Sequence, residues 1–365
     1  MITISLCMIV KNEQQTLSRC LESVRDVVDE IIIVDTGSTD GTKDVAKKYT
    51  DKIYDFKWID DFSSARNFSF SKASMDYCMW LDADDIISEK NKVKLLKLKN
   101  RLSTNQVDVI MLKYETGFDE NNNPNFFYYR ERILKNNSNA KWYGQIHETI
   151  PPFGKIVYED ISITHRKLKS DDADRNINIF EKMISNNVKL SPRQQFYYAR
   201  ELYYHKNYLK AVDIFEGFLN CEDGWIENKI DACKIMSYCY SEAGEKNKIL
   251  SCLLRSFQFD KPRAEICCEI GNYFLSCKDY PTAIFWYKIA LDLPQDYKSG
   301  GFISTDYYGY IPNIQLCVCY YHIGQIDKAR MFNQEAGKYK PKSEAYLTNK
   351  LFFEKIFKGD EHDAL

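Results

Sequence analysis

The chain has 365 residues, of which 44% are hydrophobic and 28% are charged, as is usual for a globular protein in water. Its 52 acidic and 50 basic residues nearly cancel, so net charge gives no reason to expect a nucleic-acid partner. A chain of this length exceeds what one hydrophobic core commonly supports, and we expect two domains.

The N-terminal apolar run, residues 2–10, is short and lacks a basic region before it, so we interpret it as a buried strand rather than a signal peptide. No segment has the length of a continuous membrane span. We therefore expect a cytoplasmic protein with no membrane span. The 12 cysteines agree with this expectation, because most lie among apolar residues and none forms a C-x-x-C pair.

The first half of the chain alternates strand and helix patterns. Its β-branched apolar runs are typical of parallel strands covered on both faces, which predicts an α/β domain with a mostly parallel sheet. Ligands of such sheets bind beyond the carboxyl ends of strands. The predicted strands are 2–10, 30–34, 53–54 and 77–81, the predicted helices are 13–24, 42–49 and 64–74, and less regular strands follow at 107–114, 126–134 and 156–163.

The second half is predicted to be helical throughout after Ser191-Pro192, and it repeats. Residues 198–211 match 270–283, residues 319–329 are a third copy, and 238–245 fit a degenerate copy. Ala211 and Ala283 lie 72 positions apart, about two periods of ~34 residues, as in tetratricopeptide repeats. Such arrays form solenoids with a concave binding surface. An insertion at 295–310 precedes the last copy.

Three motifs carry the chemistry. Asp35-Thr-Gly-Ser follows the second strand, Ala65-Arg66-Asn67 lies on the third helix, and Asp82-Ala83-Asp84-Asp85 follows the strand at 77–81. Two carboxylates one residue apart at a strand end can share a hard divalent ion, or divide between an ion and a ribose. An isolated Asp-x-Asp is also common in solvated turns, so its meaning depends on the other two motifs.

Together and in this order, the motifs resemble the catalytic domain of glycosyltransferase family 2, which has the GT-A fold. The match is close over residues 3–90 and looser up to His165. The resemblance implies a GT-A domain at 1–168, a linker or bridging helix at 169–190, and a tetratricopeptide-like repeat domain at 191–365. It also implies inverting transfer from a UDP-sugar, with glucose or N-acetylglucosamine as the sugar and Mn²⁺ or Mg²⁺ as cofactor.

The resemblance assigns the donor site as well. Asp35 is expected to receive the uracil or its ribose, Arg66 to lie near the nucleotide, and Asp82 to face the ribose. Val10 and Asn12, at the end of the first strand, are also assigned to the donor nucleotide. Asp35 could instead cap its turn, and Arg66 could be a surface ion pair.

Metal binding is assigned to Asp84 and to His165. His165 ends the strand at 161–164, where many GT-A enzymes place a third metal ligand, although a lone histidine after a strand is more often structural. The ion would neutralise negative charge that develops on the departing pyrophosphate.

The catalytic base is expected later in the chain. Trp142-Tyr-Gly-Gln-Ile-His147-Glu148 resembles an aromatic-Gly-x-x-His-Glu segment of family 2 members that carry repeat domains. Glu148 is assigned as the base, and His147 as a neighbour that orients it or touches phosphate. Asp85 and Glu131 stay open as alternative bases. Arg130 and Arg132 could contact phosphates, but we favour the interpretation that they only flank a strand.

The repeats indicate a polypeptide acceptor, as in bacterial enzymes that glycosylate flagellin or bacteriocin precursor peptides on Ser, Thr or Cys. Transfer to a cell-envelope polysaccharide or a lipid-linked sugar is the alternative within enzymes. A non-catalytic repeat adaptor is the alternative from a different functional class. It is disfavoured because four candidate site residues are present together: Asp35, Asp82, Asp84 and Glu148. Repeat surfaces also mediate self-association, so a homodimer is left open.

Overall fold

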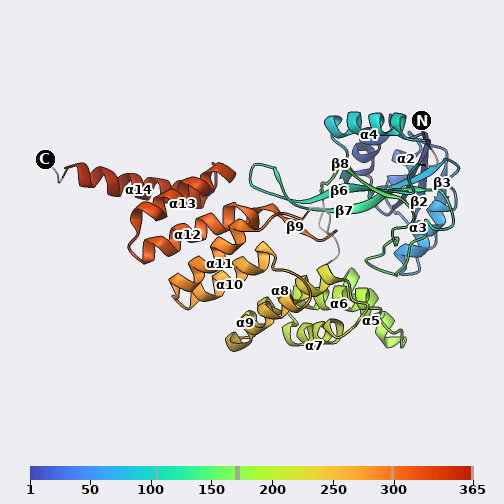
Figure 1. Cartoon of the computed structure of the whole chain (residues 1–365). Helices are drawn as coiled ribbons and strands as arrows, with labels where there is room; N and C mark the ends of the chain where they lie inside the picture. Colours follow the sequence, from blue (N-terminus) through green and yellow to red (C-terminus); the bar gives the residue numbers. More distant parts are fainter. Residues whose placement is uncertain (104–105, 169–172, 297–299, 363–365) are drawn as a thin grey trace. The chain divides into compact units, whose positions relative to one another are not determined.

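The computed structural model describes residues 1–103, 106–168, 173–296 and 300–362. Its contacts divide the chain into two compact units (Figure 1). The first unit comprises Met1–Gly117 and Phe127–Leu190, and the second comprises Phe118–Phe126 and Ser191–Leu365. Within the described residues, no helix combines the length and apolar character that crossing a membrane requires.

A mixed sheet forms the first unit, with strand order β3-β2-β1-β4-β7-β6-β8-β5. Its N-terminal part is parallel, and nearly every residue of β1, β2 and β4 is buried, which explains their continuous apolar runs. The elements of this part are β1 (Ile4–Val10), α1 (Leu17–Val24), β2 (Glu30–Asp35), α2 (Thr42–Ala46), β3 (Ile53–Asp55), α3 (Phe62–Phe70) and β4 (Tyr77–Trp80).

The later strands reverse and extend the sheet. β7 runs antiparallel to β4, β8 runs parallel to β6, and β5 pairs antiparallel with β8. This last register sets Asp85 opposite His165 and so joins the end of the sheet to the Asp82 loop. The elements are β5 (Asp85–Ile86), α4 (Glu89–Arg101), β6 (Val109–Phe118), β7 (Pro124–Lys135), β8 (Ile156–His165) and α5 (Arg175–Ser185).

The predicted α/β class is confirmed, with local corrections. α1 begins at Leu17 rather than at residue 13, because residues 13–16 form turns after β1. α3 begins at Phe62, where Asp61 caps it by accepting the amide of Ser64 at 2.9 Å. α4 was not predicted, although its Ser88 cap is a start signal. Of the expected linker at 169–190, residues 169–172 lie outside the described residues, and α5 belongs to the first unit.

Helical hairpins build the second unit, as the repeats predict. Ala211, Ala283 and Ala329, the small residues of the three clearest copies, are fully buried in the second helices of their pairs. The helices are α6 (Pro192–Tyr204), α7 (Tyr208–Leu219), α8 (Ile226–Glu242), α9 (Lys246–Arg255), η1 (Ser256–Gln258), α10 (Ala264–Ser276), α11 (Tyr280–Asp292), η2 (Thr305–Tyr308), α12 (Tyr310–His322), α13 (Ile326–Tyr339) and α14 (Glu344–His362).

The insertion before the last hairpin corrects one prediction. The prediction that the second half is helical throughout is wrong here, because β9 (Ile303–Ser304) is a short strand. Residues 297–299 of the insertion lie outside the described residues. Within the second unit the insertion contacts the tip of the β6–β7 hairpin. The hydroxyl of Thr305 donates to the carbonyl of Asn125 at 3.3 Å, and the rings of Phe126 and Phe302 stack with centroids 5.9 Å apart.

A buried carboxylate links three strands of the first unit. Glu30, at the start of β2, accepts hydrogen bonds from the hydroxyl of Ser5 on β1 and from the amide and hydroxyl of Ser74, which precedes β4. Lys52 completes the set with an ion pair. Burial alone would raise the pKa of Glu30, but the bonds from Lys52, Ser5 and Ser74 outweigh it and lower the pKa to about 2.

We predict that Glu30→Gln lowers the free energy of unfolding by about 1–3 kcal/mol at pH 7. The folded-state pKa is depressed, so this contribution is present above the unfolded pKa of about 4.3 and is lost as pH falls toward 2. Urea unfolding at pH 7 and pH 3 checks both points. Glu22→Gln, which breaks a half-exposed ion pair with Arg25, is the control; an equal loss in both variants would contradict the prediction.

Candidate active site

The loop after β2 presents a buried carboxylate. Asp35 is 1% exposed, and its Oδ1 accepts the amides of Gly37 and Ser38, both at 2.9 Å. Gly37 has φ +105°, a conformation that glycine adopts without strain. The other oxygen, Oδ2, is buried and has no hydrogen-bond partner among the described residues. Asp35 therefore does cap its turn, and it keeps one oxygen that can accept a donor group from a ligand.

The loop after β1 lies beside it. Val10 pairs in register with Asp35, and its carbonyl accepts both the amide and the hydroxyl of Thr36, at 2.9 and 3.1 Å. Asn12, with φ +57°, accepts the amide of Thr39 through Oδ1 at 2.7 Å. The structure therefore brings Val10, Asn12 and Asp35 together at the carboxyl ends of two neighbouring parallel strands.

Arg66 joins two of the other predicted residues. On α3, its Nε donates to Glu148 Oε1 at 2.6 Å, and its Nη2 donates to Asp82 Oδ1 at 2.8 Å. The guanidinium carbon lies 4.9 Å from the ring centroids of both Trp80 and Trp142. Arg66 is not a surface ion pair, since its side chain is only 8% exposed. Two charge-assisted bonds and two aromatic neighbours thus hold one cation in place.

The electrostatics follow from these contacts. Burial would lower the pKa of Arg66, but Asp82 and Glu148 outweigh it and raise the pKa above its ordinary value, so the guanidinium stays charged. Burial would likewise raise the pKa of Asp82, yet Arg66, followed by Arg132, lowers it to about 2. Asp82 keeps 34% of its side chain exposed, and can still meet a ligand.

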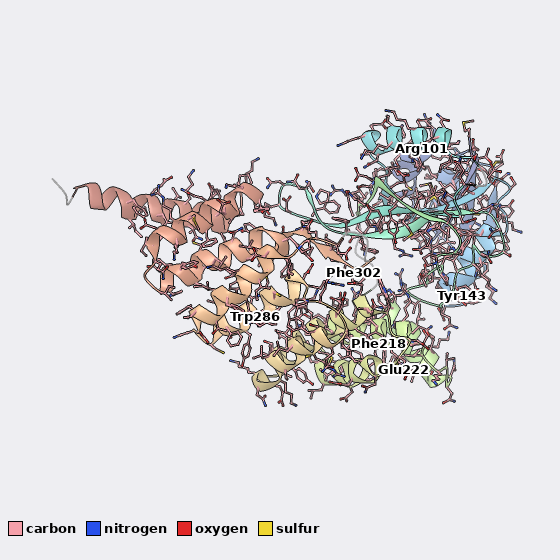
Figure 2. The ribbon with its side chains drawn as sticks, viewed as in Figure 1. Arg101, Tyr143, Phe218, Glu222, Trp286 and Phe302 are labelled. Carbon is pink, nitrogen blue, oxygen red and sulfur yellow. The ribbon has the colours of Figure 1, made fainter. Side chains whose placement is uncertain are left out.

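The loop that carries His147 and Glu148 is fastened to α3. Asn67 donates to the carbonyl of Trp142 at 3.0 Å and accepts its amide at 2.9 Å. The exposed Tyr143 of this loop is labelled in Figure 2. His147 has φ +49°, and its ring lies nearly parallel to that of Phe180, with centroids 6.2 Å apart.

A second cluster lies at the end of β8. Nδ1 of His165 lies 3.3 Å from Asp84 Oδ1 and 3.2 Å from Asp85 Oδ1, and the hydroxyl of Tyr114 is 2.9 Å from the same nitrogen. One ligand atom from each of Asp84, Asp85 and His165 lies within 4.8 Å of the others. Burial would lower the pKa of His165, but the bonds to Asp84 and Asp85 outweigh it and raise the pKa to about 10.

This donor set fits a divalent cation. Two carboxylates and an imidazole are ligands that Mn²⁺ accepts, and Mg²⁺ accepts the carboxylates. The imidazole of His165 lies within 3.3 Å of both carboxylates, and its raised pKa places a positive charge beside them. An ion there would supply that charge and release the imidazole proton.

Sequence reasoning overlooked how Asp85 and Arg132 act. Asp85 was considered only as an alternative base, but its Oδ2 accepts the amide of Asp82 at 3.0 Å and Nη1 of Arg132 at 3.0 Å. Arg132, for which strand flanking was favoured, is fully buried with its guanidinium carbon 3.7 Å from the Trp80 ring centroid. The signal was the charged run Arg130-Glu131-Arg132 between aromatic and aliphatic residues of one strand, because a charged side chain that is buried there requires a partner.

Part of the chain is similar to proteins of a known family. Residues 5–156 match the family model described as Glycosyl transferase family 2. Asp35, Arg66, Asp82, Asp84 and Glu148 lie inside that range, and His165 lies beyond it. The SPbeta prophage-derived glycosyltransferase SunS of Bacillus subtilis (strain 168) is 30% identical over 231 residues, which cover 60% of this chain and 53% of SunS.

Two further similarities are more limited. A TPR repeat-containing protein of Synechococcus elongatus is 48% identical over 85 residues, 23% of this chain and 21% of that protein. The crystal structure of residues 1–349 of S. aureus TarS in complex with UDP-GlcNAc covers 94% of this chain and 93% of its own, at 11% identity and a TM-score of 0.38, too low to support an inference. The chain spans about half the length of SunS.

We predict that Asp84→Asn and His165→Gln each weaken Mn²⁺ binding by the full chain at least about tenfold. Electron paramagnetic resonance of free Mn²⁺, with UDP present, measures the affinity. Asp44→Asn, which removes one exposed carboxylate of α2, is the control and is expected to bind as the wild type does. Unchanged affinity in the first two variants would contradict the assignment.

Proposed function

We propose that the chain transfers a sugar from a UDP-sugar to a polypeptide, because residues 5–156 match the glycosyltransferase family 2 model and tetratricopeptide-type helices follow them. Glucose and N-acetylglucosamine are the proposed sugars. The acceptor atom is the side-chain oxygen of Ser or Thr, or the sulfur of Cys. The observation that carries the proposal is the bridge from Arg66 to both Asp82 and Glu148.

The donor nucleotide is proposed to lie over the ends of β1 and β2. The unpartnered Oδ2 of Asp35 can accept a hydrogen bond from the uracil N–H or from a ribose hydroxyl. Asp82, with a third of its side chain exposed, can accept another from the ribose. Arg66, held by its two carboxylates, fixes Asp82 in place for this contact.

The reaction breaks the bond between the anomeric carbon and the pyrophosphate, and UDP departs with the bonding electrons. The acceptor hydroxyl or thiol attacks the opposite face of the sugar, which inverts the configuration, and gives its proton to a base. Glu148 is the proposed base: its carboxylate is 12% exposed, and Arg66 fixes it beside Asp82. His147, which precedes Glu148 in the chain, is proposed to orient its carboxylate.

Asp84, Asp85 and His165 are the proposed metal ligands. When bound there, Mn²⁺ or Mg²⁺ would neutralise charge on the pyrophosphate as a Lewis acid. Arg132 positions this set through Asp85, because its bond fixes the carboxylate that also holds the amide of Asp82.

A polypeptide acceptor is proposed because helical hairpin arrays present extended surfaces that bind peptides. Polysaccharide or lipid-linked acceptors are the competing choice within the same chemistry. Each prospective acceptor is tested by adding it to the transfer assay.

Release of free UDP from a panel of UDP-sugars, with Mn²⁺, Mg²⁺ or EDTA, tests the proposal. We predict that one donor releases UDP in a metal-dependent way, and that Asp84→Ala slows release by about 100-fold or more. Asp44→Ala, exposed and outside the site, is expected to keep the wild-type rate. If no donor binds or releases UDP with either metal, the transferase proposal is wrong and a non-catalytic adaptor replaces it.

A further inference from the structure

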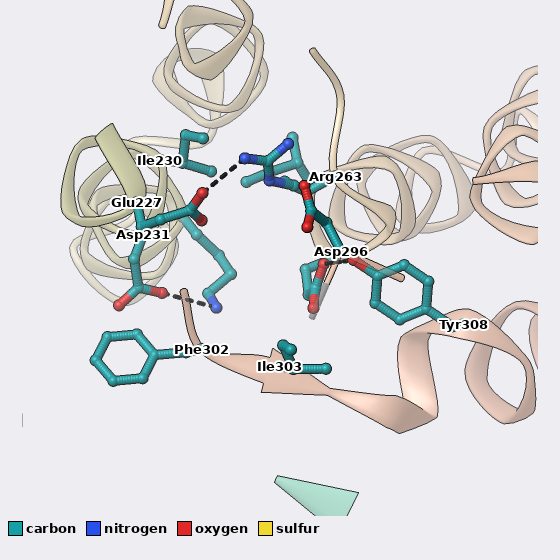
Figure 3. A pocket seen from close by; sticks show the side chains of 11 residues that line it. Glu227, Ile230, Asp231, Arg263, Asp296, Phe302, Ile303 and Tyr308 are labelled. Atoms are coloured by element: carbon teal, nitrogen blue, oxygen red, sulfur yellow. Dashed lines mark hydrogen bonds and ion pairs between the residues drawn. The ribbon is translucent and has the colours of Figure 1, made fainter. Parts of the chain in front are cut away.

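The hollow in the repeat unit has a lining whose charges compensate one another. It lies beside α8 and α10, and two ion pairs of its lining are drawn in Figure 3. Nη2 of Arg263 lies 2.7 Å from Oε1 of Glu227, and Nζ of Lys234 lies 2.8 Å from Oδ1 of Asp231. Such a lining does not require a ligand. A side chain with a more specific placement lies in the first unit: Tyr114, beside the proposed metal ligands.

The register of the sheet places Tyr114 next to the end of β8. β6 runs parallel to β8, and Tyr114 pairs with Ile163. His165 is the second residue after Ile163, and alternate residues of a strand share a face, so both lie on the same face of the sheet. Tyr114 is 6% exposed and therefore approaches the imidazole of His165 from the protein interior.

The hydroxyl of Tyr114 bonds this imidazole. It lies 2.9 Å from Nδ1 of His165, and it has no second hydrogen-bond partner in the part of the chain that the structure describes. The two rings meet edge to face, with centroids 5.7 Å apart and planes inclined at 63°. The hydrogen bond and the ring contact together oppose rotation of the imidazole, whose Nδ1 lies within 3.3 Å of both Asp84 and Asp85.

Tyr114 also contacts the group that holds Asp85. The guanidinium carbon of Arg132 lies 4.2 Å from the ring centroid of Tyr114, and Nη1 of Arg132 donates to Asp85 Oδ2 at 3.0 Å. The ring of Tyr128 packs against Tyr114 with centroids 5.6 Å apart. One buried side chain thus contacts His165 directly and Asp85 through Arg132, and these are two of the three proposed metal ligands.

We propose that Tyr114 is a positioning residue of the metal centre, whose hydroxyl holds the imidazole of His165 in the orientation that faces Asp84 and Asp85. The proposal rests on the proposed function, because it takes these three residues to be the metal ligands. Outer hydrogen-bond partners of metal-binding histidines commonly contribute a factor of about 10–100 to metal affinity. Tyr114 acts through His165 and is not itself placed among the ligands.

Mn²⁺ binding by the full chain tests this role, measured by electron paramagnetic resonance of the free ion with UDP present. We predict that Tyr114→Phe weakens binding about tenfold, because it removes the hydroxyl and keeps the ring. Tyr77→Phe is the matched control. This fully buried tyrosine of β4 donates its hydroxyl to the carbonyl of Val107, and its variant is expected to bind Mn²⁺ as the wild type does.

A double-variant cycle separates positioning from a general loss of structure. In a His165→Ala background, Tyr114→Phe is expected to cause no further loss of Mn²⁺ affinity, because the hydroxyl acts through the imidazole. Losses that multiply, wild-type affinity in Tyr114→Phe, or an equal loss in Tyr77→Phe would each overturn the proposal. Thermal unfolding of each variant confirms that it is folded.

Asp84→Asn distinguishes the role of Tyr114 from the proposed function. If Asp84→Asn weakens Mn²⁺ binding and Tyr114→Phe does not, only the role of Tyr114 is wrong. If neither variant changes the Mn²⁺ affinity, the proposed metal centre is wrong, and so is the role of Tyr114.

Discussion

The buried guanidinium of Arg66 is the interaction on which the candidate site depends. It lies against Trp80 and Trp142 and bonds Asp82 and Glu148, and the latter is 82 positions away in the chain. Each carboxylate alone would be costly in this environment; Arg66 bonds both, and Arg132 adds a second positive charge that acts on Asp82. Removing one partner of such a pair commonly costs about 3–5 kcal/mol, because a buried charge is left without compensation. One group thus holds Asp82, which is proposed to bind the nucleotide, and Glu148, which is proposed to act on the acceptor.

Asp85 extends this arrangement toward the proposed metal ligands. One of its oxygens accepts both the amide of Asp82 and Nη1 of Arg132, and the other lies 3.2 Å from His165. The turn after β4 consequently carries both Asp82, proposed to bind the donor, and two of the three proposed metal ligands, Asp84 and Asp85. Polar groups connected in this way act as a unit, and a change at either end is expected to reach the other.

Much of the architecture was predictable from local patterns. The runs at 30–34 and 77–81 are buried strands because β-branched and apolar residues suit a covered parallel sheet, and Ala211 and Ala283 mark close helix pairs. The contacts within the candidate site were harder to predict from the sequence. The bond between Arg66 and Glu148 depends on a loop folding back on α3, and that between Arg132 and Asp85 on the register of β7 against β4. Neither leaves a periodic pattern in the chain.

The coupling between Arg66 and Glu148 is the most direct test of this account. The rate of UDP release would be measured for Arg66→Gln, Glu148→Gln and the double variant, with the donor that the wild type accepts. The account predicts that the double variant loses little more than the more damaged single variant, because the two residues act as one unit. If the loss of rate in the double variant equals the product of the two single losses, Arg66 and Glu148 act independently and this account is contradicted.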